Sequence, residues 1–201
     1  MRYYFSAILI LVTFSGCFSP TPQQTLYIKN KTKLYTQYTI WIKHSDKNLF
    51  YVNKPFIEDT FVLPINSEVI VRGFRKDLIM DYRGRTIKYN HISVVDENGK
   101  VSNKAKQNLF DNLLQPTPLN LNSFTKLEQG NIEINEVVEG MSKEAVMTSI
   151  GIPFYPMTFS FNDNKWYYGN ALLIVFKNNK AIRVKDNRVV MTKQVNNIPF
   201  K

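Results

Sequence analysis

The side chain best suited to covalent modification is Cys17, the only cysteine in a chain of 201 residues. It follows a single positive charge, Arg2, and an apolar run over residues 3–14 that two small polar residues interrupt. This run is shorter than the roughly 20 residues of a membrane-spanning helix. A positive start, a short apolar run and then small residues are typical of a secretory signal. We therefore expect residues 1–16 to form a signal peptide.

The four residues around the expected cleavage point, Phe14-Ser15-Gly16-Cys17, are similar to the lipobox of bacterial lipoproteins, although leucine is usual where Phe14 stands. The resemblance implies cleavage between Gly16 and Cys17, a diacylglycerol on the Cys17 thiol and acylation of the new amine. Each buried methylene contributes about 0.8 kcal/mol, and stable anchoring takes more than one chain. The alternatives are a buried core cysteine and an ordinary signal peptide that contains a cysteine.

The residue after the cysteine bears on the destination of the protein. It is Phe18, whereas an aspartate there would favour inner-membrane retention under the enterobacterial sorting scheme. We therefore expect a lipid-anchored protein of the outer membrane that faces the periplasm. Export makes nucleic acid an unexpected partner, and lipidation of Cys17 leaves no thiol for a disulfide.

The chain is basic, with a formal net charge of +10, and its densest basic cluster is a candidate anion-binding site. Lipid headgroups or an anionic cell-wall polymer are the ligands that such a cluster would attract. The alternative, which we favour, is a set of solvated strand edges on which cations discourage aggregation. The cluster comprises Arg72, Arg75, Lys76, Arg83 and Arg85.

No other group of residues predicts a metal site or a catalytic centre. The two histidines, His44 and His91, lack neighbouring cysteines or carboxylates at ligand spacing, so we expect both at the surface. Glu133, Glu136 and Glu139 would share one face of a helix, and a solvated face is more common there than a cation site. We therefore predict no metal, no cofactor beyond the covalent lipid, and no enzymatic activity.

The elements of the first half are predicted from local patterns. Residues 17–25 are polar with two prolines, and we expect a lipidated tether that keeps the folded part near the membrane. Short alternating runs over residues 26–100, with a hairpin around Gly84, predict a small antiparallel β domain, either a sheet or a barrel. Residues 102–114 change to a helical period and predict a linking helix, which an inter-domain linker follows within the segment 101–128.

The second half, residues 129–188, is expected to combine helices with a small sheet. A first helix is predicted near residues 132–138. Ser142 can cap a second helix, and Gly151 is placed to end that helix with positive φ. Three strands then follow one another through tight turns, and the apolar run over residues 171–176 predicts a central strand covered on both faces.

Three aromatic residues in the first of these strands have different expected roles. Alternation puts Trp166 and Tyr168 on one face, where we expect them to pack in the core. Tyr167 points to the other face and is a candidate partner contact. Residues 189–201 follow the last strand as a tail.

Residues 130–186 resemble the SmpA/OmlA (BamE-like) family of bacterial lipoproteins. The signature is a Gly-Met-Ser-Lys helix start, an Ile-Gly-x-Pro helix end and a Trp-x-Tyr strand, in that order. The resemblance implies an α+β domain of two helices packed on a three-stranded antiparallel sheet. The residues to which it gives structural roles are Gly140, Met141, Ser142, Val146, Gly151, Pro153, Trp166, Tyr168 and Phe176.

The whole chain resembles two-part proteobacterial envelope lipoproteins, with Leu63-Pro-Ile-Asn-Ser67 before the Gly-Met-Ser-Lys segment. Because the family includes a subunit of the outer-membrane β-barrel assembly machine, the expected function is that of an interaction or scaffolding module, with that machine as a candidate envelope partner. The alternative is an envelope protein that binds a cell-wall polymer or an anionic lipid. An inhibitor of a secreted enzyme is a third alternative, which only its similarity of architecture to β-lactamase inhibitor proteins supports.

Overall fold

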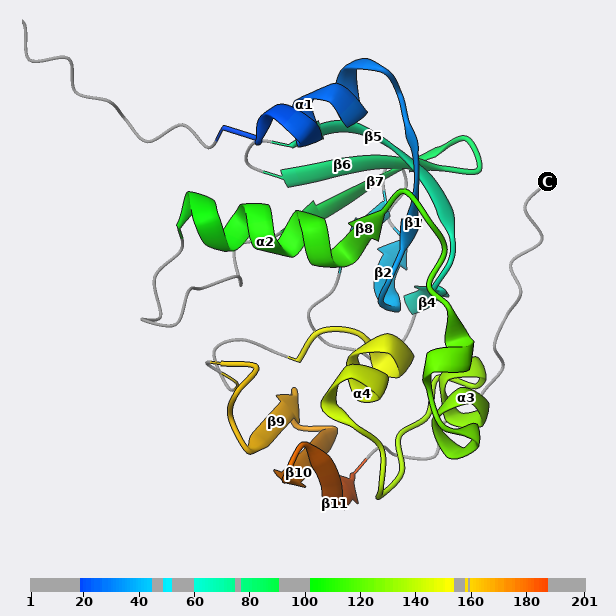
Figure 1. Ribbon diagram of the computed structural model, residues 1–201, viewed down its shortest axis with the longest axis vertical. Coiled ribbons are helices and arrows are strands. Elements are labelled where there is room, and N and C mark those ends of the chain that lie inside the picture. The colour runs from blue at the N-terminus through cyan, green and yellow to red at the C-terminus, as the bar shows by residue number, and fades with distance from the viewer. Residues whose placement is uncertain are drawn as a thin grey trace, which may run out of the picture.

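The computed structural model describes residues 19–44, 49–51, 60–74, 77–90, 102–153, 158 and 160–187. Helices combine with two sheets, one of eight strands and one of three, so the α+β prediction is confirmed. The two sheets lie toward opposite ends of the longest axis (Figure 1). Two buried apolar clusters, one for each sheet, define an N-terminal and a C-terminal unit. None of the described helices is both long enough and apolar enough to cross a bilayer.

The larger sheet has the strand order β4-β2-β3-β7-β6-β5-β1-β8. Its neighbours run antiparallel except β3 and β7, which are parallel, so the prediction of a purely antiparallel sheet is wrong at this pair. No hairpin turn joins these two strands, and their relative direction is therefore not fixed by a local connection. The strands are β1 (Lys33–Thr36), β2 (Ile40–His44), β3 (Leu49–Tyr51), β4 (Thr60–Leu63), β5 (Glu68–Phe74), β6 (Asp77–Tyr82), β7 (Arg85–Asn90) and β8 (Leu114–Gln115).

The helix α2 (Asn103–Leu113) belongs to the core of this sheet. It buries Leu109, Phe110 and Leu113, and the rings of Phe110 and Phe74 have centroids 5.1 Å apart. The helix itself was predicted from its apolar period, but its expected role as a link between the two units is wrong. Its apolar stripe is buried against the N-terminal sheet, because an amphipathic helix is stabilised by packing that stripe.

The N-terminal tether was predicted to reach Thr25, but a helix, α1 (Pro22–Lys29), begins within it. Thr21 and Gln24 form a capping box, and Pro22 occupies the first turn, where its missing N–H costs nothing. The side chain of Gln24 is fully buried and donates to Asp111 Oδ1 of α2 over 2.8 Å. The sequence signal for this helix is therefore its cap and not an apolar period.

The C-terminal unit contains α3 (Lys126–Glu133), α4 (Lys143–Ile150) and a short 3-10 helix, η1 (Leu121–Ser123). The expected first helix near residues 132–138 is wrong, because α3 ends at Glu133 and Asn135 adopts a left-handed φ of 54°. The predicted boundary between residues 128 and 129 consequently falls inside α3. Both helices pack together with the strands in one buried cluster.

The smaller sheet has the order β11-β10-β9 and is antiparallel throughout. Its strands are β9 (Lys165–Tyr168), β10 (Leu172–Lys177) and β11 (Lys180–Asp186). The central strand β10 buries Leu172, Ile174 and Phe176 on its inner face, while Leu173 and Val175 on its other face are half-buried. The expected burial on both faces is therefore complete on one face only.

The two units are joined through β2 and the end of α4. Trp41 Nε1 donates to the carbonyl of Ile150 over 2.9 Å, and Thr39 Oγ1 donates to the carbonyl of Thr148 over 3.0 Å. Gly151 follows with φ of +85°, and a Cβ at this position would stand 2.5 Å from the carbonyl oxygen of Thr39. Only glycine fits this close approach without movement of the backbone.

Candidate functional site: the Glu128 junction and the N-terminal basic cluster

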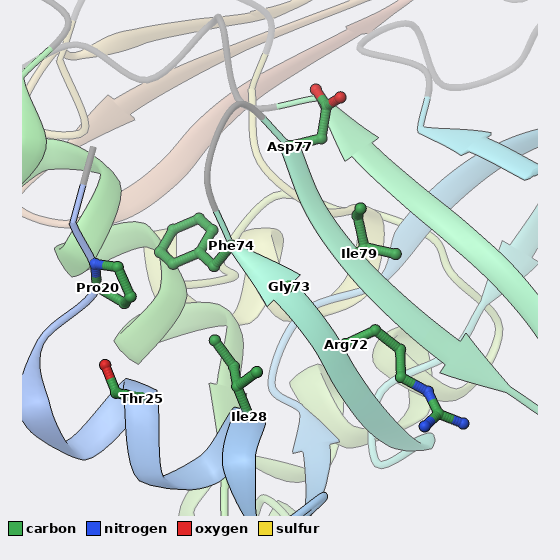
Figure 2. A pocket seen from close by; sticks show the side chains of 8 residues that line it. All are labelled: Pro20, Thr25, Ile28, Arg72, Gly73, Phe74, Asp77 and Ile79. Atoms are coloured by element: carbon green, nitrogen blue, oxygen red, sulfur yellow. The ribbon is translucent and has the colours of Figure 1, made fainter. Parts of the chain in front are cut away.

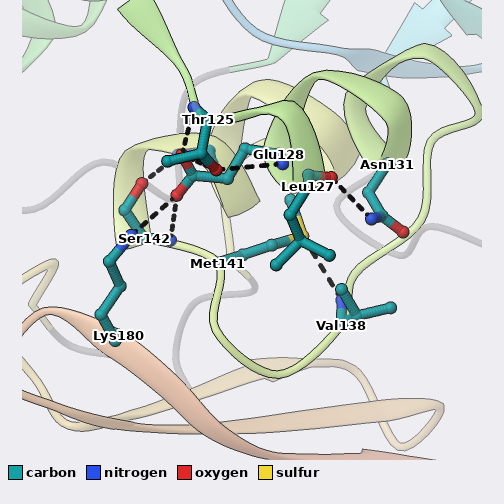
Figure 3. Close-up of polar contacts among 9 residues, drawn as sticks. Thr125, Leu127, Glu128, Asn131, Val138, Met141, Ser142 and Lys180 are labelled. Atoms are coloured by element: carbon teal, nitrogen blue, oxygen red, sulfur yellow. Dashed lines mark hydrogen bonds and ion pairs between the residues drawn. The ribbon is translucent and has the colours of Figure 1, made fainter.

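Ser142 of the Gly-Met-Ser segment and Lys180 of β11 meet at one acidic side chain, Glu128, which the sequence had not singled out (Figure 3). Glu128 is the third residue of α3 and forms a capping box with Thr125. Its carboxylate accepts hydrogen bonds from Thr125 N over 3.0 Å and from Ser142 N over 2.8 Å, and Lys180 Nζ lies 3.1 Å away. One carboxylate therefore joins α3, the cap of α4 and the start of β11.

The electrostatics of this junction favour the ionised carboxylate. Burial raises the pKa of Glu128, since the side chain is almost inaccessible to solvent, but the donors from Ser142, Thr125 and Lys180 offset burial and hold the pKa at about 2. Against its ordinary value of 4.5, this difference corresponds to roughly 3 kcal/mol of stabilisation at neutral pH. Glu128 is thus a structural charge that is compensated from three elements.

The Gly-Met-Ser segment runs along the edge of β11 at this junction. Gly140 N donates to the carbonyl of Ala181 over 2.7 Å, and Ala181 N donates to the carbonyl of Met141 over 2.8 Å. Gly140 has a φ of +92°, which favours glycine. Ser142 N-caps α4 through its side chain, which accepts from Ala145 N. The motif therefore attaches the start of α4 to the sheet.

The other motif residues lie in the core of the C-terminal unit. Trp166 and Tyr168 are fully buried, as alternation placed them, and the rings of Trp166 and Phe176 have centroids 4.7 Å apart. The Tyr168 hydroxyl donates to the carbonyl of Gly151 over 2.9 Å. Val146 and Pro153 are also buried. Trp166 Nε1 has no hydrogen-bond partner among the described residues.

Lys143, the first residue of α4, covers this aromatic core from the solvent side. Its Nζ lies 5.4 Å from the ring centroids of both Trp166 and Phe176 and donates to the carbonyl of Phe161 over 3.0 Å. Burial lowers the pKa of Lys143, and the Asp163 carboxylate partly opposes that shift. The lysine of the motif is thus held by ring faces and one carbonyl.

The predicted anion site on the N-terminal unit contains its own acids. Arg72 is paired with Asp81 on the neighbouring strand, and Asp81 also accepts from Thr86 Oγ1. The Arg83 guanidinium carbon lies 5.2 Å over the Tyr82 ring. Arg85 lies at the start of β7, whereas Arg75 and Lys76 are outside the described residues.

A groove of about 480 Å³ adjoins this cluster between α1 and the strands β5 and β6 (Figure 2). Its walls are mostly apolar, including Ile28, Phe74 and Ile79, while Arg72 and Asp77 lie at its edges. An anion bound near Arg72 would face the Asp81 carboxylate that already pairs with this arginine. The arrangement therefore favours the alternative of a solvated, internally paired surface.

The remaining candidates do not form a site in the described part of the chain. There, no three His, Cys, Asp or Glu side chains come together as metal ligands. Glu133, Glu136 and Glu139 do not share a helical face, because α3 ends at Glu133. Cys17, His91 and the tail over residues 189–201 lie outside the described residues, as does the side chain of His44.

Comparisons of the chain with family models, with curated proteins and with solved structures found no match.

Proposed function

We propose that this protein is a non-enzymatic, lipid-anchored protein of the outer membrane whose C-terminal unit is a periplasmic interaction module. The observation that carries the proposal is the packing of α3 and α4 on the three-stranded antiparallel sheet. The SmpA/OmlA resemblance implies this combination of elements, and Ser142 of its motif bonds to Glu128 at the junction with Lys180. The candidate partner is a subunit of the β-barrel assembly machine or another envelope protein.

The position of α1 supports a short anchor. This helix begins at Pro22, five positions after the proposed lipidation site Cys17. Five residue steps span at most about 18 Å, so the start of α1 would stay within about that distance of the bilayer surface. A lipid on Cys17 would raise the local concentration of the module near envelope partners, and weak contacts would then suffice for binding.

Replacement of the cysteine tests the anchor. We expect Cys17→Ala to abolish incorporation of labelled palmitate and to move the chain from the membrane fraction to the soluble periplasmic fraction. Lys104→Ala on the exposed surface of α2 is the matched control, and it should stay with the membrane. A Cys17→Ala chain that remains with the membrane to the wild-type extent contradicts the proposal.

Capture from detergent-solubilised envelopes tests the partner. The wild-type chain should recover the same envelope proteins in constant ratio. A variant that disrupts the Glu128 junction should lose them, provided that it is still produced. The interaction role is wrong if only lipid or glycan is recovered with the wild-type chain.

A further inference from the structure

The face of the three-stranded sheet that points away from α3 and α4 carries a charge pattern that the function proposed above does not use. We call it the outer face and define it by Lys165 and Tyr167 of β9, Leu173 and Val175 of β10, and Arg183 and Lys185 of β11. Residues that alternate with these, such as Trp166, Ile174 and Phe176, are buried on the opposite face. The side chains of the outer face therefore project away from the core.

The strand register arranges these residues in two rows. Lys165 lies opposite Val175, which lies opposite Arg183, and Tyr167 lies opposite Leu173, which lies opposite Lys185. Apolar side chains thus occupy the centre, where they are half-buried, and exposed cations flank them. An apolar centre with a polar rim is the usual composition of a protein–protein interface.

The cations of the outer face are not paired with acids in the described part of the chain. Lys165, Arg183 and Lys185 form no ion pair with any residue that the structure describes. Asp186, at the end of β11, lies opposite Leu172, whose side chain is buried on the inner face, so alternation turns Asp186 to that side. The positive potential of the outer face is therefore not cancelled within the sheet.

The position of this face in the molecule limits what it can contact. The helix α4 packs on the inner face of the sheet and also bonds to β2 through Ile150, so it lies between the two sheets. The outer face consequently lies at the end of the longest axis opposite to α1, where the chain enters the fold (Figure 1). With a short anchor before α1, this face is directed away from the anchoring membrane.

We propose that the outer face is a docking surface for an acidic segment of a protein partner in the periplasm. Carboxylates of the partner would pair with Lys165, Arg183 and Lys185, and an apolar side chain between them would cover Leu173 and Val175. The apolar centre of the outer face favours a protein partner over a hydrated anionic glycan. The distance of this face from α1 favours a protein partner over headgroups of the anchoring bilayer. The inference deepens the proposed function and rests on its anchored orientation.

Site-specific photo-crosslinking in intact envelopes tests the proposal with the full-length chain. Tyr167 is replaced by benzoylphenylalanine, and the control places the same probe at Ile134, an exposed apolar position of the same unit. Expected is an adduct with protein at position 167 whose crosslinked peptide, identified by mass spectrometry, is rich in Asp and Glu. An adduct with phospholipid or glycan, or no adduct above the Ile134 level, overturns the proposal.

Charge reversal separates specific docking from incidental proximity. Arg183→Glu combined with Lys185→Glu should reduce the adduct at position 167 at least tenfold. Lys29→Glu combined with Lys104→Glu gives the same change of net charge on the N-terminal unit and should leave the adduct unchanged. Equal yields from both double variants overturn the proposal. Membrane retention of Cys17→Ala contradicts the anchor instead, so the two failures are distinguishable.

Discussion

The two units handle charge in opposite ways. On the N-terminal unit two cations are paired with acids on neighbouring strands, Arg72 with Asp81 and Lys33 with Glu68. On the C-terminal unit the acid Glu128, which accepts from several donors, is buried, while the cations of the outer face form no ion pair with a described residue. Within the described residues, Arg72 of the densest basic run is therefore less available to an anionic partner than the cations of the outer face. The register of neighbouring strands determines which cations lie beside an acid and which do not.

The largest effect should come from removing the buried acid. Glu128→Ala leaves the N–H groups of Thr125 and Ser142 without their acceptor, and we expect a loss of about 3 kcal/mol in the free energy of unfolding. Denaturant unfolding of the Cys17→Ala chain measures this loss. Lys180→Ala is the control and should cost roughly 1 kcal/mol or less, because Lys180 is half-exposed and water can take the place of its ammonium group beside Glu128. Equal losses in the two variants would show that the ion pair, and not the backbone donors, stabilises the junction.

Acid should reproduce part of this loss without a substitution. The pKa of Glu128 is about 2 in the folded state and ordinarily 4.5, so its contribution is fully present above about pH 5 and is lost as the pH falls toward 2. Thermal unfolding between pH 6 and pH 2.5 measures the change. Glu128→Gln removes this titration, and the difference in stability between the two chains should therefore shrink toward acid. A constant difference across this range would contradict the assigned pKa.

A substitution at the join between the two units should destabilise the protein more than a substitution on either charged surface. Gly151→Ala forces a methyl group against the Thr39 carbonyl and keeps a left-handed φ, at a cost of roughly 2 kcal/mol. Hydrogen exchange should show earlier opening at β2 and at the end of α4. Gly130→Ala is the control, because a Cβ there meets no atom within 4 Å and alanine favours the helix. If both variants have the wild-type Tm, the close approach at residue 151 does not restrict this position to glycine.

The smallest effect on stability should come from the surface pair of the N-terminal unit. Asp81→Asn should cost less than about 1 kcal/mol, since exposed ion pairs contribute little. The same change leaves Arg72 without its acid, so the Cys17→Ala chain should gain affinity for vesicles of phosphatidylglycerol and phosphatidylcholine. Arg72→Gln with Asp81→Asn is the control and should remove the gain. Strong vesicle binding by a chain that retains Asp81, and that depends on Arg72, would show that pairing with Asp81 does not keep Arg72 from anionic ligands.

Local patterns predicted a large part of this fold. Alternation identified β5, β6 and β7, and capping and termination signals identified α4 between Ser142 and Gly151. The positions of α1 and α3 were missed because both depend on capping boxes, Thr21 with Gln24 and Thr125 with Glu128. Both boxes could have been read from the sequence, since each places a Gln or Glu three residues after a threonine.

The contacts that make the candidate sites could not be read in the same way. Glu128 and Lys180 are 52 positions apart, and their contact depends on how β11 returns beside the start of α4. The outer face likewise depends on a register that sets Arg183 opposite Val175 after a bulge in the pairing. A one-residue slip would exchange the faces, so sequence alternation alone did not identify the cations that remain without acids.

The close approach of Gly151 to Thr39 also fixes the distance between the N-terminal sheet and the outer face. No side chain separates the units at this point, and hydrogen bonds from Thr39 and Trp41 hold the end of α4 on β2. If Cys17 is lipidated, the folded part is a spacer of fixed length between the tether and the outer face. Added tether residues would then change how far the outer face reaches, while its orientation relative to the N-terminal sheet would stay the same.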